Sequence, residues 1–308
     1  MSKFQRVFSG VRTWVARHRE QLWAYLFIAP GILTFLVFNL FSTLASVGIS
    51  FTDWRLLKPP NFVGLANYQR LFADPVFSKA LVNTGIYTFV GVPVGVFLAL
   101  LLAMALNQQI KGITFFRVAY YMPVISASVA IAMVWMWIFS RDYGILNYLI
   151  RSLGGTSVDW LNNTKTVLLA ATIVSIWKDL GFKVIIFLAA LQDIPEDLMD
   201  AAKIDGARWW QQFTRVVVPL ISPAILYVTI TGFIGAVQGF DIVYNMRFDH
   251  DGGPARATTT LAFYIWEMGF SNLRMGYAAT LAIALFLIIL LITFIQWRLR
   301  KRFVYAEV

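Results

Sequence analysis

The sequence predicts an all-α membrane protein with six transmembrane helices and one helical loop in the cytoplasm. Of its 308 residues, 59% are hydrophobic and only 14% are charged, whereas soluble domains carry about 25% charged residues. Several stretches without a charged side chain are long enough to cross the hydrocarbon core of a bilayer, which is about 30 Å thick. Because backbone N–H and C=O groups must be paired within a segment that crosses lipid, these stretches are expected to be helices.

Five uncharged stretches are the predicted first, second, third, fifth and sixth spans. Each is at least 23 residues long, and they cover residues 21–52, 80–110, 118–140, 216–240 and 275–297. The predicted fourth span, Val167 to Leu191, is as apolar as the others but carries Lys178, Asp179 and Lys183 near its middle. An ionisable residue at the centre of a membrane helix costs at least about 2.5 kcal/mol. We therefore expect these charged residues to line a pathway or to pair with internal partners.

The basic residues predict the orientation of the chain. Lysine and arginine are about twice as dense in the two tails and in the loops 111–117 and 193–215 as in the other three connections, and the positive-inside rule assigns the denser side to the cytoplasm. Both termini are therefore predicted to be cytoplasmic. The predicted divisions are a cytoplasmic N-tail (1–20), a transmembrane domain (21–297, with its core at 80–297 and a cytoplasmic loop at 193–218) and a cytoplasmic C-tail (298–308).

The loop between the fourth and fifth spans has the pattern of a short helical module. Pro195 suits the first position of a helix, and Glu196 and Asp197 place negative charge in the first turn, where the helix dipole favours it. Gly206 can end this helix or bend it sharply. A second helix is predicted to follow, with one face formed by Trp209, Phe213 and Val216. Small residues flanked by acids in such a loop suit insertion into a groove of another protein.

The spacing in this loop resembles the EAA loop of binding-protein-dependent ABC transporter permeases. The family pattern is Glu-Ala-Ala, three residues, Gly, nine residues and Ile-x-Leu-Pro; here it stands as Asp200-Ala201-Ala202, Gly206 and Val216-Val217-Val218-Pro219. Because aspartate is shorter than glutamate, we expect Asp200 to reach its partner less well without abolishing docking.

Further segments are similar to the sugar permeases of the maltose and glycerol-phosphate transporters, and together they span nearly the whole chain. They are Tyr25–Gly31, Phe51–Trp54, Phe62–Tyr68, Phe115–Pro123, Leu188–Pro195 and Gly276–Ala279. One segment departs from the pattern, because Asn245–Pro254 lacks the Leu-Thr that relatives usually have before Gly-Gly-Pro.

The resemblance implies a type I ABC importer permease fold and a coupling loop that docks into a cytoplasmic ATPase. The coupling residues would be Asp200, Ala201, Ala202, Asp205, Gly206 and Ala207; the alternative is an ordinary interfacial loop. No Gly-Lys dipeptide occurs in the chain, which excludes a Walker A loop. ATP and magnesium would therefore be used by the partner ATPase, with no cofactor bound by this chain.

The resemblance also implies the partners and the location. The partners would be a second homologous permease subunit, two copies of the ATPase, an extracytoplasmic solute-binding protein, a carbohydrate and membrane lipid. The location would be the plasma membrane of a bacterium or archaeon. Nucleic acid is not an expected partner, because the net charge of +10 in so apolar a chain fits the cytoplasmic flanks of membrane spans.

A substrate pathway is predicted from the fourth and fifth spans. Ser175, Lys178, Asp179 and Phe182 recur at a spacing of three or four around one broad helical face, and the matching positions line the sugar cavity in maltose-type relatives. Gln238 and Asp241, near the outer end of the fifth span, extend this set. Adjacent residues on a helix point about 100° apart. We therefore expect at most one of Lys178 and Asp179 to face the centre of a cavity, while the other pairs with a neighbouring helix or subunit.

Sugars are neutral polyols that are usually bound by an aromatic platform with hydrogen-bonding groups at its edge. The candidate aromatics are Trp177, Phe182, Phe240 and Tyr244. In the alternative interpretation, the intramembrane lysine and aspartate form a structural pair between subunits, and the aromatics are near them only because aromatics are 16% of the chain.

The leading functional hypothesis is a non-enzymatic permease that passes a di- or oligosaccharide inward by alternating access. An ion-coupled secondary transporter is the alternative, but it would need no docking loop and would usually show inverted repeats. An intramembrane enzyme is disfavoured because the chain lacks cysteine, an HExxH pair and a GxSxG elbow. His18 and His250 are predicted on opposite sides of the membrane, and Asp249-His250-Asp251 would make a poor metal cage. For Lys3–Arg19, a basic amphipathic helix on anionic lipid and a disordered tail both stay open.

Overall fold

The computed structural model describes residues 19–108, 112–246 and 252–303. The first 18 residues of the predicted N-tail, the C-tail from residue 304 and the Asp249-His250-Asp251 segment lie outside the described residues. Every regular element in the described part is a helix, which confirms the predicted all-α class. From the N-terminus these elements are α2 (Arg19–Thr34), η1 (Phe35–Phe41), α3 (Ser42–Ser50), α4 (Ala66–Ala73), α5 (Pro75–Leu106), α6 (Ile113–Ile125), α7 (Ser128–Ile138), α8 (Ile145–Ser152), α9 (Val167–Gln192), α10 (Glu196–Ile204), α11 (Trp209–Gln212), η2 (Phe213–Val217), α12 (Val218–Leu220), α13 (Ser222–Val237), α14 (Asp241–Asn245), η3 (Pro254–Arg256), α15 (Leu261–Trp266), η4 (Glu267–Ser271) and α16 (Met275–Phe303).

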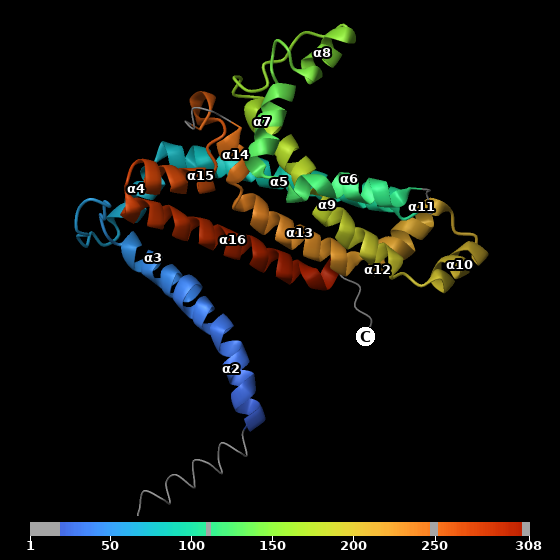
Figure 1. Ribbon diagram of the computed structural model, residues 1–308, viewed down its shortest axis with the longest axis horizontal. Helices are drawn as coiled ribbons and strands as arrows, with labels where there is room; N and C mark the ends of the chain where they lie inside the picture. Colours follow the sequence, from blue (N-terminus) through green and yellow to red (C-terminus); the bar gives the residue numbers. More distant parts are fainter. Residues whose placement is uncertain (1–18, 109–111, 247–251, 304–308) are drawn as a thin grey trace, which may run out of the picture.

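Helices α5, α9, α13 and α16 form the centre of the molecule (Figure 1). Two glycines of α5 allow it to pack closely against α9. A Cβ atom at Gly91 would lie 3.2 Å from the methyl carbon of Thr172, and Gly95, one turn later, faces Ile176 and Lys183. Small residues at this spacing let two membrane helices approach, so that van der Waals contact stabilises the pair. The α5–α9 contact is the framework on which the candidate site is built.

The predicted spans appear as three unbroken helices, two bent pairs and α9. Among the described residues, the helices Trp23–Ser50, Pro75–Leu106 and Met275–Arg300 are long and apolar enough to cross a membrane. The bent pairs are α6 with α7, at 103°, and Trp209–Leu220 with α13, at 66°. Helix α9 has 26 residues and occupies the predicted fourth span. The architecture agrees with the predicted fold class.

The predicted third span is divided by the 103° bend between α6 and α7. Pro123 has no N–H for the helical ladder, and the Ser126 hydroxyl donates a hydrogen bond of 2.8 Å to the Met122 carbonyl. Ala127 then takes an extended conformation, with φ −61° and ψ 130°. A charge-free stretch therefore marks a membrane segment without revealing that its helix is broken.

The first span leads away from the bundle towards its N-terminal end (Figure 1). Helix α2, segment η1 and helix α3 run on without a break, and none of the most apolar window of this span is buried against the rest of the chain. Phe27 and Phe38, for example, are 78% and 71% exposed. In a membrane these side chains contact lipid or another subunit.

A half-buried carboxylate joins three elements at the end of the bundle opposite α10. The Asp74 carboxylate caps the first turn of α5 by accepting a hydrogen bond from the Val76 N–H at 2.8 Å. Its other oxygen accepts hydrogen bonds from the hydroxyls of Tyr264 in α15, at 2.6 Å, and Tyr277 in α16, at 2.5 Å. We call these four residues the Asp74 junction. It ties the start of α5 to the segment that precedes the last span.

The segment after the fifth span is held to α5 by side chains. Asn83 donates hydrogen bonds of 2.9 Å to the backbone carbonyls of Arg256 and Thr259, and the Thr84 hydroxyl accepts one from the Leu261 N–H at 2.9 Å. Ala255 and Arg256 have positive φ angles of 50° and 58°, which non-glycine residues adopt only when the surrounding structure holds them. Residues 255–261 are therefore fixed against α5 by these hydrogen bonds.

A glycine-to-alanine pair tests the packing of α9. A Cβ atom at Gly181 would lie 2.5 Å from the Tyr120 carbonyl oxygen of α6, whereas a Cβ atom at Gly85 in α5 would meet nothing within 4 Å. We expect Gly181→Ala to lower the free energy of unfolding by about 1–3 kcal/mol. Gly85→Ala, its matched control, should raise it by up to about 1 kcal/mol because alanine is the better helix former. Thermal unfolding of the purified protein in detergent measures both, and equal midpoints would contradict the close approach of α6 and α9.

Candidate functional site

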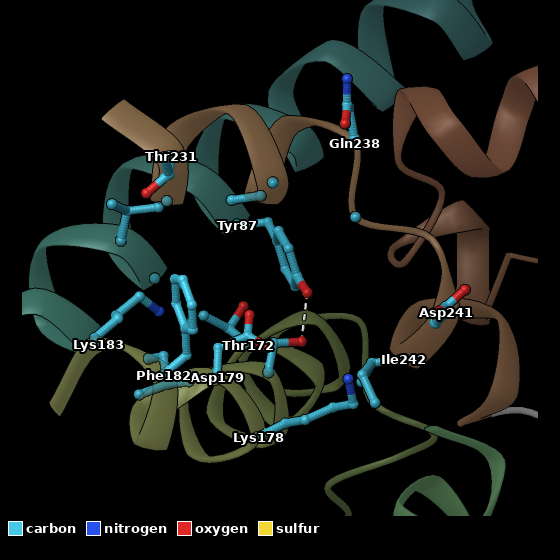
Figure 2. Close-up of a pocket in the computed structure, with 18 of the residues that line it drawn as sticks. Tyr87, Thr172, Lys178, Asp179, Phe182, Lys183, Thr231, Gln238, Asp241 and Ile242 are labelled. Carbon is cyan, nitrogen blue, oxygen red and sulfur yellow. Dashed lines mark hydrogen bonds between the residues drawn. The ribbon is translucent and has the colours of Figure 1, made fainter. Parts of the chain in front are cut away.

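A cavity of about 500 Å³ lies between α5, α9, α13 and the start of α14 (Figure 2). All six residues that the sequence predicts for a substrate pathway line it. They are Ser175, Lys178, Asp179, Phe182, Gln238 and Asp241. The residues of α9 face the cavity from one side, while Gln238 and Asp241 flank the break between α13 and α14. Residues about 60 positions apart in the chain therefore meet at one site.

Lys178 and Asp179 both contribute to the cavity, and the prediction that at most one of them faces its centre stays a prediction. Both side chains line the cavity, because it extends around α9 and the long lysine stem reaches along its edge (Figure 2). Neither side chain makes a hydrogen bond or an ion pair with another residue in the part of the chain that the structure describes. The cavity therefore offers one free carboxylate and one free ammonium group from adjacent positions.

A tyrosine that sequence analysis missed forms the wall opposite α9. The hydroxyls of Tyr87 in α5 and Ser175 in α9 are hydrogen-bonded to each other. Gly239 makes room for the tyrosine, because a Cβ atom there would lie 2.8 Å from the ring. The contact joins residues 88 positions apart, and no local spacing could have indicated it.

Lys183, a charged residue of the fourth span, was not among the six residues predicted for the substrate pathway. It lines the cavity and lies four residues after Asp179 and eight after Ser175, so a helix places all three on one face. This periodicity could have identified it. Thr172 and Thr231 add further hydroxyl groups to the lining.

Two of the four candidate aromatics line the cavity. Phe182 and Phe240 lie in its wall, and Tyr244 stacks on Phe240 with ring centroids 4.9 Å apart. Trp177 instead packs edge-on against Trp135 of α7, at 5.5 Å, away from the cavity. The site thus combines aromatic faces with carboxylate, amide, hydroxyl and ammonium groups, which is the chemistry that suits a polyol.

The broken helix places the carboxylate of Asp241. Helix α13 ends at Val237 and α14 begins at Asp241, so the backbone between them is irregular beside the cavity. Irregular backbone at membrane depth is tolerated where it lines a cavity. The Ser128 hydroxyl of α7 donates a hydrogen bond of 3.4 Å to the Asp241 carboxylate. A ligand at this end would therefore contact the segment that connects the fifth span to the rest of the chain.

The predicted coupling loop projects beyond one end of the bundle (Figure 1). None of the residues of α10 is buried. Its first residue is Glu196, so Pro195 precedes the helix as its N-cap instead of occupying the first helical position, because its ψ of 132° is not helical. The helix ends in a Schellman motif: Gly206, at φ 76°, donates its N–H to the Lys203 carbonyl, and the Ala207 N–H reaches the Ala202 carbonyl.

Most side chains of this loop are exposed to solvent. Asp200 accepts a hydrogen bond from Lys203 at 2.8 Å, and this bond raises the pKa of the Lys203 ammonium group. Ile204, Trp209 and Trp210 are 86%, 64% and 62% exposed. Large apolar side chains gathered on one projecting loop indicate a surface that is covered by another molecule.

No metal centre is present among the described residues, since no three histidine or acidic side chains there lie close enough together to hold an ion.

Comparisons with known proteins agree with this arrangement. Residues 79–305 match the family described as "Binding-protein-dependent transport system inner membrane component". The lactose transport system permease protein LacF of Rhizobium radiobacter is 37% identical over 279 residues, covering 89% of this chain and 92% of LacF. The sulfoquinovosyl glycerol transport system permease protein SmoG of Agrobacterium fabrum is 32% identical, covering 91% of each chain. The arabinooligosaccharides transport system permease protein AraP of Bacillus subtilis is also 32% identical, covering 91% of this chain and 88% of AraP.

The fold is also found in a solved structure. A chain in the crystal structure of a bacterial alginate ABC transporter, in complex with an alginate pentasaccharide-bound periplasmic protein, superposes with a TM-score of 0.82. The match covers 96% of this chain and 99% of that chain, at 22% identity. At this identity the similarity establishes a common fold.

Proposed function

Because this chain belongs to the family of inner membrane components of binding-protein-dependent transport systems, we propose that it passes a di- or oligosaccharide across the plasma membrane by alternating access. The chain is a membrane-embedded ABC transporter permease and not an enzyme, since ATP is hydrolysed by a separate subunit. Family membership also decides against an ion-coupled secondary transporter.

The cavity between α5, α9 and α13 is the observation that carries the substrate class. Asp179, Asp241 and Gln238 present hydrogen-bonding groups to it, and Phe182 and Phe240 present aromatic faces. A volume of about 500 Å³ suits a molecule of a few sugar rings, because ligand pockets of this size range accommodate drug-sized molecules. The named substrates of the relatives, lactose and arabinooligosaccharides, support the same class.

We propose that α10 and the turn at Gly206 couple ATP hydrolysis by the partner ATPase to movement of the permease. The coupling residues Asp200–Ala202 and Asp205–Ala207 would dock into a groove on a cytoplasmic ATPase, where Ile204 would be buried. Closure of two ATPases on ATP binding would move this loop together with α11–α13. Because Gln238 and Asp241 lie directly after α13, that movement would change the cavity wall.

The assembly that this mechanism requires has four kinds of component. We propose a second homologous permease subunit, two ATPase copies and an extracytoplasmic solute-binding protein around this chain, with both of its termini in the cytoplasm. The carbohydrate would be delivered by the binding protein and released inward, so the direction of transport follows from delivery on one side only.

Reconstitution of the whole complex in proteoliposomes tests the proposal. We expect uptake of radiolabelled oligosaccharide to require ATP inside the vesicles and loaded binding protein outside. Uptake should persist when an ionophore collapses the membrane potential. Uptake that follows the ion gradient and ignores ATP would contradict the proposed mechanism.

A variant of the cavity tests the position of the pathway. Asp179→Asn should lower the uptake rate by about tenfold or more, because a hydrogen bond to a charged group contributes about 1.5–3 kcal/mol. Asp142→Asn is the matched control, since this exposed carboxylate lies outside the cavity. Equal uptake by the two variants would place the substrate pathway elsewhere.

A further inference from the structure

Lys183 places a positive charge in the buried end of the cavity. Its residue is only 9% exposed, although it belongs to a charged type. Glycines on two neighbouring helices make room for it. A Cβ atom at Gly95 of α5 would lie 3.5 Å from the Lys183 ammonium nitrogen, and one at Gly232 of α13 would lie 3.9 Å from its Cε atom. The lysine is therefore packed among α5, α9 and α13, and it lines the cavity.

The Lys183 ammonium group has no direct partner among the residues that the structure describes. Within the described ranges it forms no ion pair and donates no hydrogen bond. The acidic group that influences it is Asp179, one helical turn earlier on α9, but the two do not form a salt bridge. Lysine is rarely buried without a counter-ion, because a buried charge without a partner is strongly destabilising.

Charged groups of both signs line the cavity, because Asp179 lies one turn before Lys183 on α9 and Lys178 reaches towards Ile242 (Figure 2). Lys183 and Thr231 lie at one end, and Asp241 and Gln238 lie at the other, with Tyr87 between them (Figure 2). The carboxylates can accept hydrogen bonds from sugar hydroxyls, whereas an ammonium group can only donate. A neutral sugar that displaced water from this end would leave the Lys183 ammonium group without a direct ionic partner, because Asp179 forms no salt bridge with it in the described part of the chain. An anionic substituent would pair with this ammonium group and satisfy its N–H donors.

We infer that Lys183 is a specificity-determining residue and that the imported carbohydrate carries an acidic group, a carboxylate, sulfonate or phosphate, that pairs with this ammonium group. The inference rests on the proposed function. It predicts the orientation of the substrate: the acidic group points into the end of the cavity beside Gly95 and Gly232, and the hydroxyls of the remaining rings face Asp179 and Asp241.

The test uses the complete complex in proteoliposomes and pairs of probes that differ in one charge. One pair is a uronic-acid disaccharide and its neutral hexose counterpart; the others are a sulfonated and an unmodified glycosyl glycerol, and a phosphorylated and an unmodified disaccharide. The variant is Lys183→Met, which keeps an unbranched side chain only one atom shorter and removes the charge. Since it takes a buried charge out of the membrane, we expect the complex to assemble, and its amount and basal ATP hydrolysis are measured. Lys79→Met is the matched control, because this lysine is exposed at the start of α5 and lies outside the cavity.

We expect the wild-type complex and Lys79→Met to take up the acidic member of at least one pair, and Lys183→Met to take it up at least about tenfold more slowly, as the loss of a charge-assisted hydrogen bond requires. Uptake of the neutral member of that pair should fall less in Lys183→Met than uptake of the acidic member, whereas Lys79→Met should leave both unchanged. The acidic probe that is imported also identifies which anion is recognised.

Two results would overturn the inference while leaving the proposed function intact. One is ATP-driven uptake of neutral probes alone by the wild-type complex. The other is an equal effect of Lys183→Met on the acidic and neutral members of a pair, which would assign Lys183 a structural role beside Asp179. ATP-driven uptake of no carbohydrate at all would instead remove the proposed function and the inference together.

Discussion

Replacement of Gly206 by valine is expected to reduce ATP-driven uptake by at least about tenfold and to release the ATPase from the purified complex. Gly206 has a φ angle of 76°, and this left-handed conformation costs a residue with a side chain about 1–2 kcal/mol, with a β-branched residue at the upper end. That energy alone corresponds to a shift of about tenfold in the population of the turn. Valine should therefore open the Schellman motif that ends α10 and displace Asp205 and Ala207, which flank the turn.

Two control variants distinguish an effect on the backbone turn at Gly206 from an effect of the added side chain. A Cβ atom at Gly206 would meet nothing within 4 Å, so the valine side chain has space in this chain and the expected effect comes from the backbone. Gly206→Asn should retain most of the uptake, because asparagine tolerates the left-handed region. Gly48→Ala, in the open surface of α3, should behave as the wild type.

The measurement is the amount of ATPase that co-purifies with the permease, together with the rate of uptake in proteoliposomes. Full retention of both in Gly206→Val would contradict the assignment of this loop as the coupling element. Loss of uptake in Gly206→Asn to the same extent as in Gly206→Val would point to steric exclusion by the partner surface instead of backbone strain.

Replacement of Asp74 by asparagine is expected to lower the free energy of unfolding by about 3 kcal/mol, because two hydrogen bonds to a carboxylate are lost, each of about 1.5 kcal/mol or more. Asparagine can still cap α5 through its carbonyl oxygen, but its NH2 group cannot accept the hydrogen bonds of Tyr264 and Tyr277. Asp74→Ala should cost about 1 kcal/mol more, since the cap is lost as well. Thermal unfolding in detergent, with Asp142→Asn as the control, measures the difference.

The contribution of Asp74 to the free energy of unfolding should decrease when the pH is lowered into the acidic range. Burial raises the pKa of the Asp74 carboxyl, but the hydrogen bonds from Tyr264, Tyr277 and the backbone outweigh it, so the pKa lies below its ordinary value of 3.8. A group whose pKa is lower in the folded state stabilises the fold above its unfolded pKa and loses this effect as the pH falls through its folded pKa.

The midpoint difference between wild type and Asp74→Asn should therefore stay constant from about pH 5 to 8 and shrink below about pH 4. A difference that grows on acidification would have the wrong sign for a stabilised carboxylate. A midpoint difference of zero at neutral pH would show that the two tyrosines find other acceptors.

The features that could be predicted from sequence are those that depend on neighbours in the chain or on the surrounding solvent. The charge-free stretches are apolar because lipid is their solvent, and they predicted the all-α membrane class. The turn at Gly206 was predicted because a helix end depends on a few consecutive residues. The periodicity of α9 placed Ser175 and Asp179 on one face, and with the resemblance to sugar permeases it selected residues that do line one cavity.

The tertiary structure alone decided which of these surfaces meet. Lys178 and Asp179, adjacent on α9, both line the cavity because its shape is set by α5 and α13 as much as by α9. The Tyr87–Ser175 contact and the Asp74 junction join residues separated by 88 to 203 positions, and the bend between α6 and α7 interrupts a uniformly apolar stretch. The hydropathy of a segment indicates only whether lipid or water surrounds it. Which helices pack together is determined by the shapes of their side chains, including the glycines that leave room for Lys183, and those shapes act only after the helices have assembled.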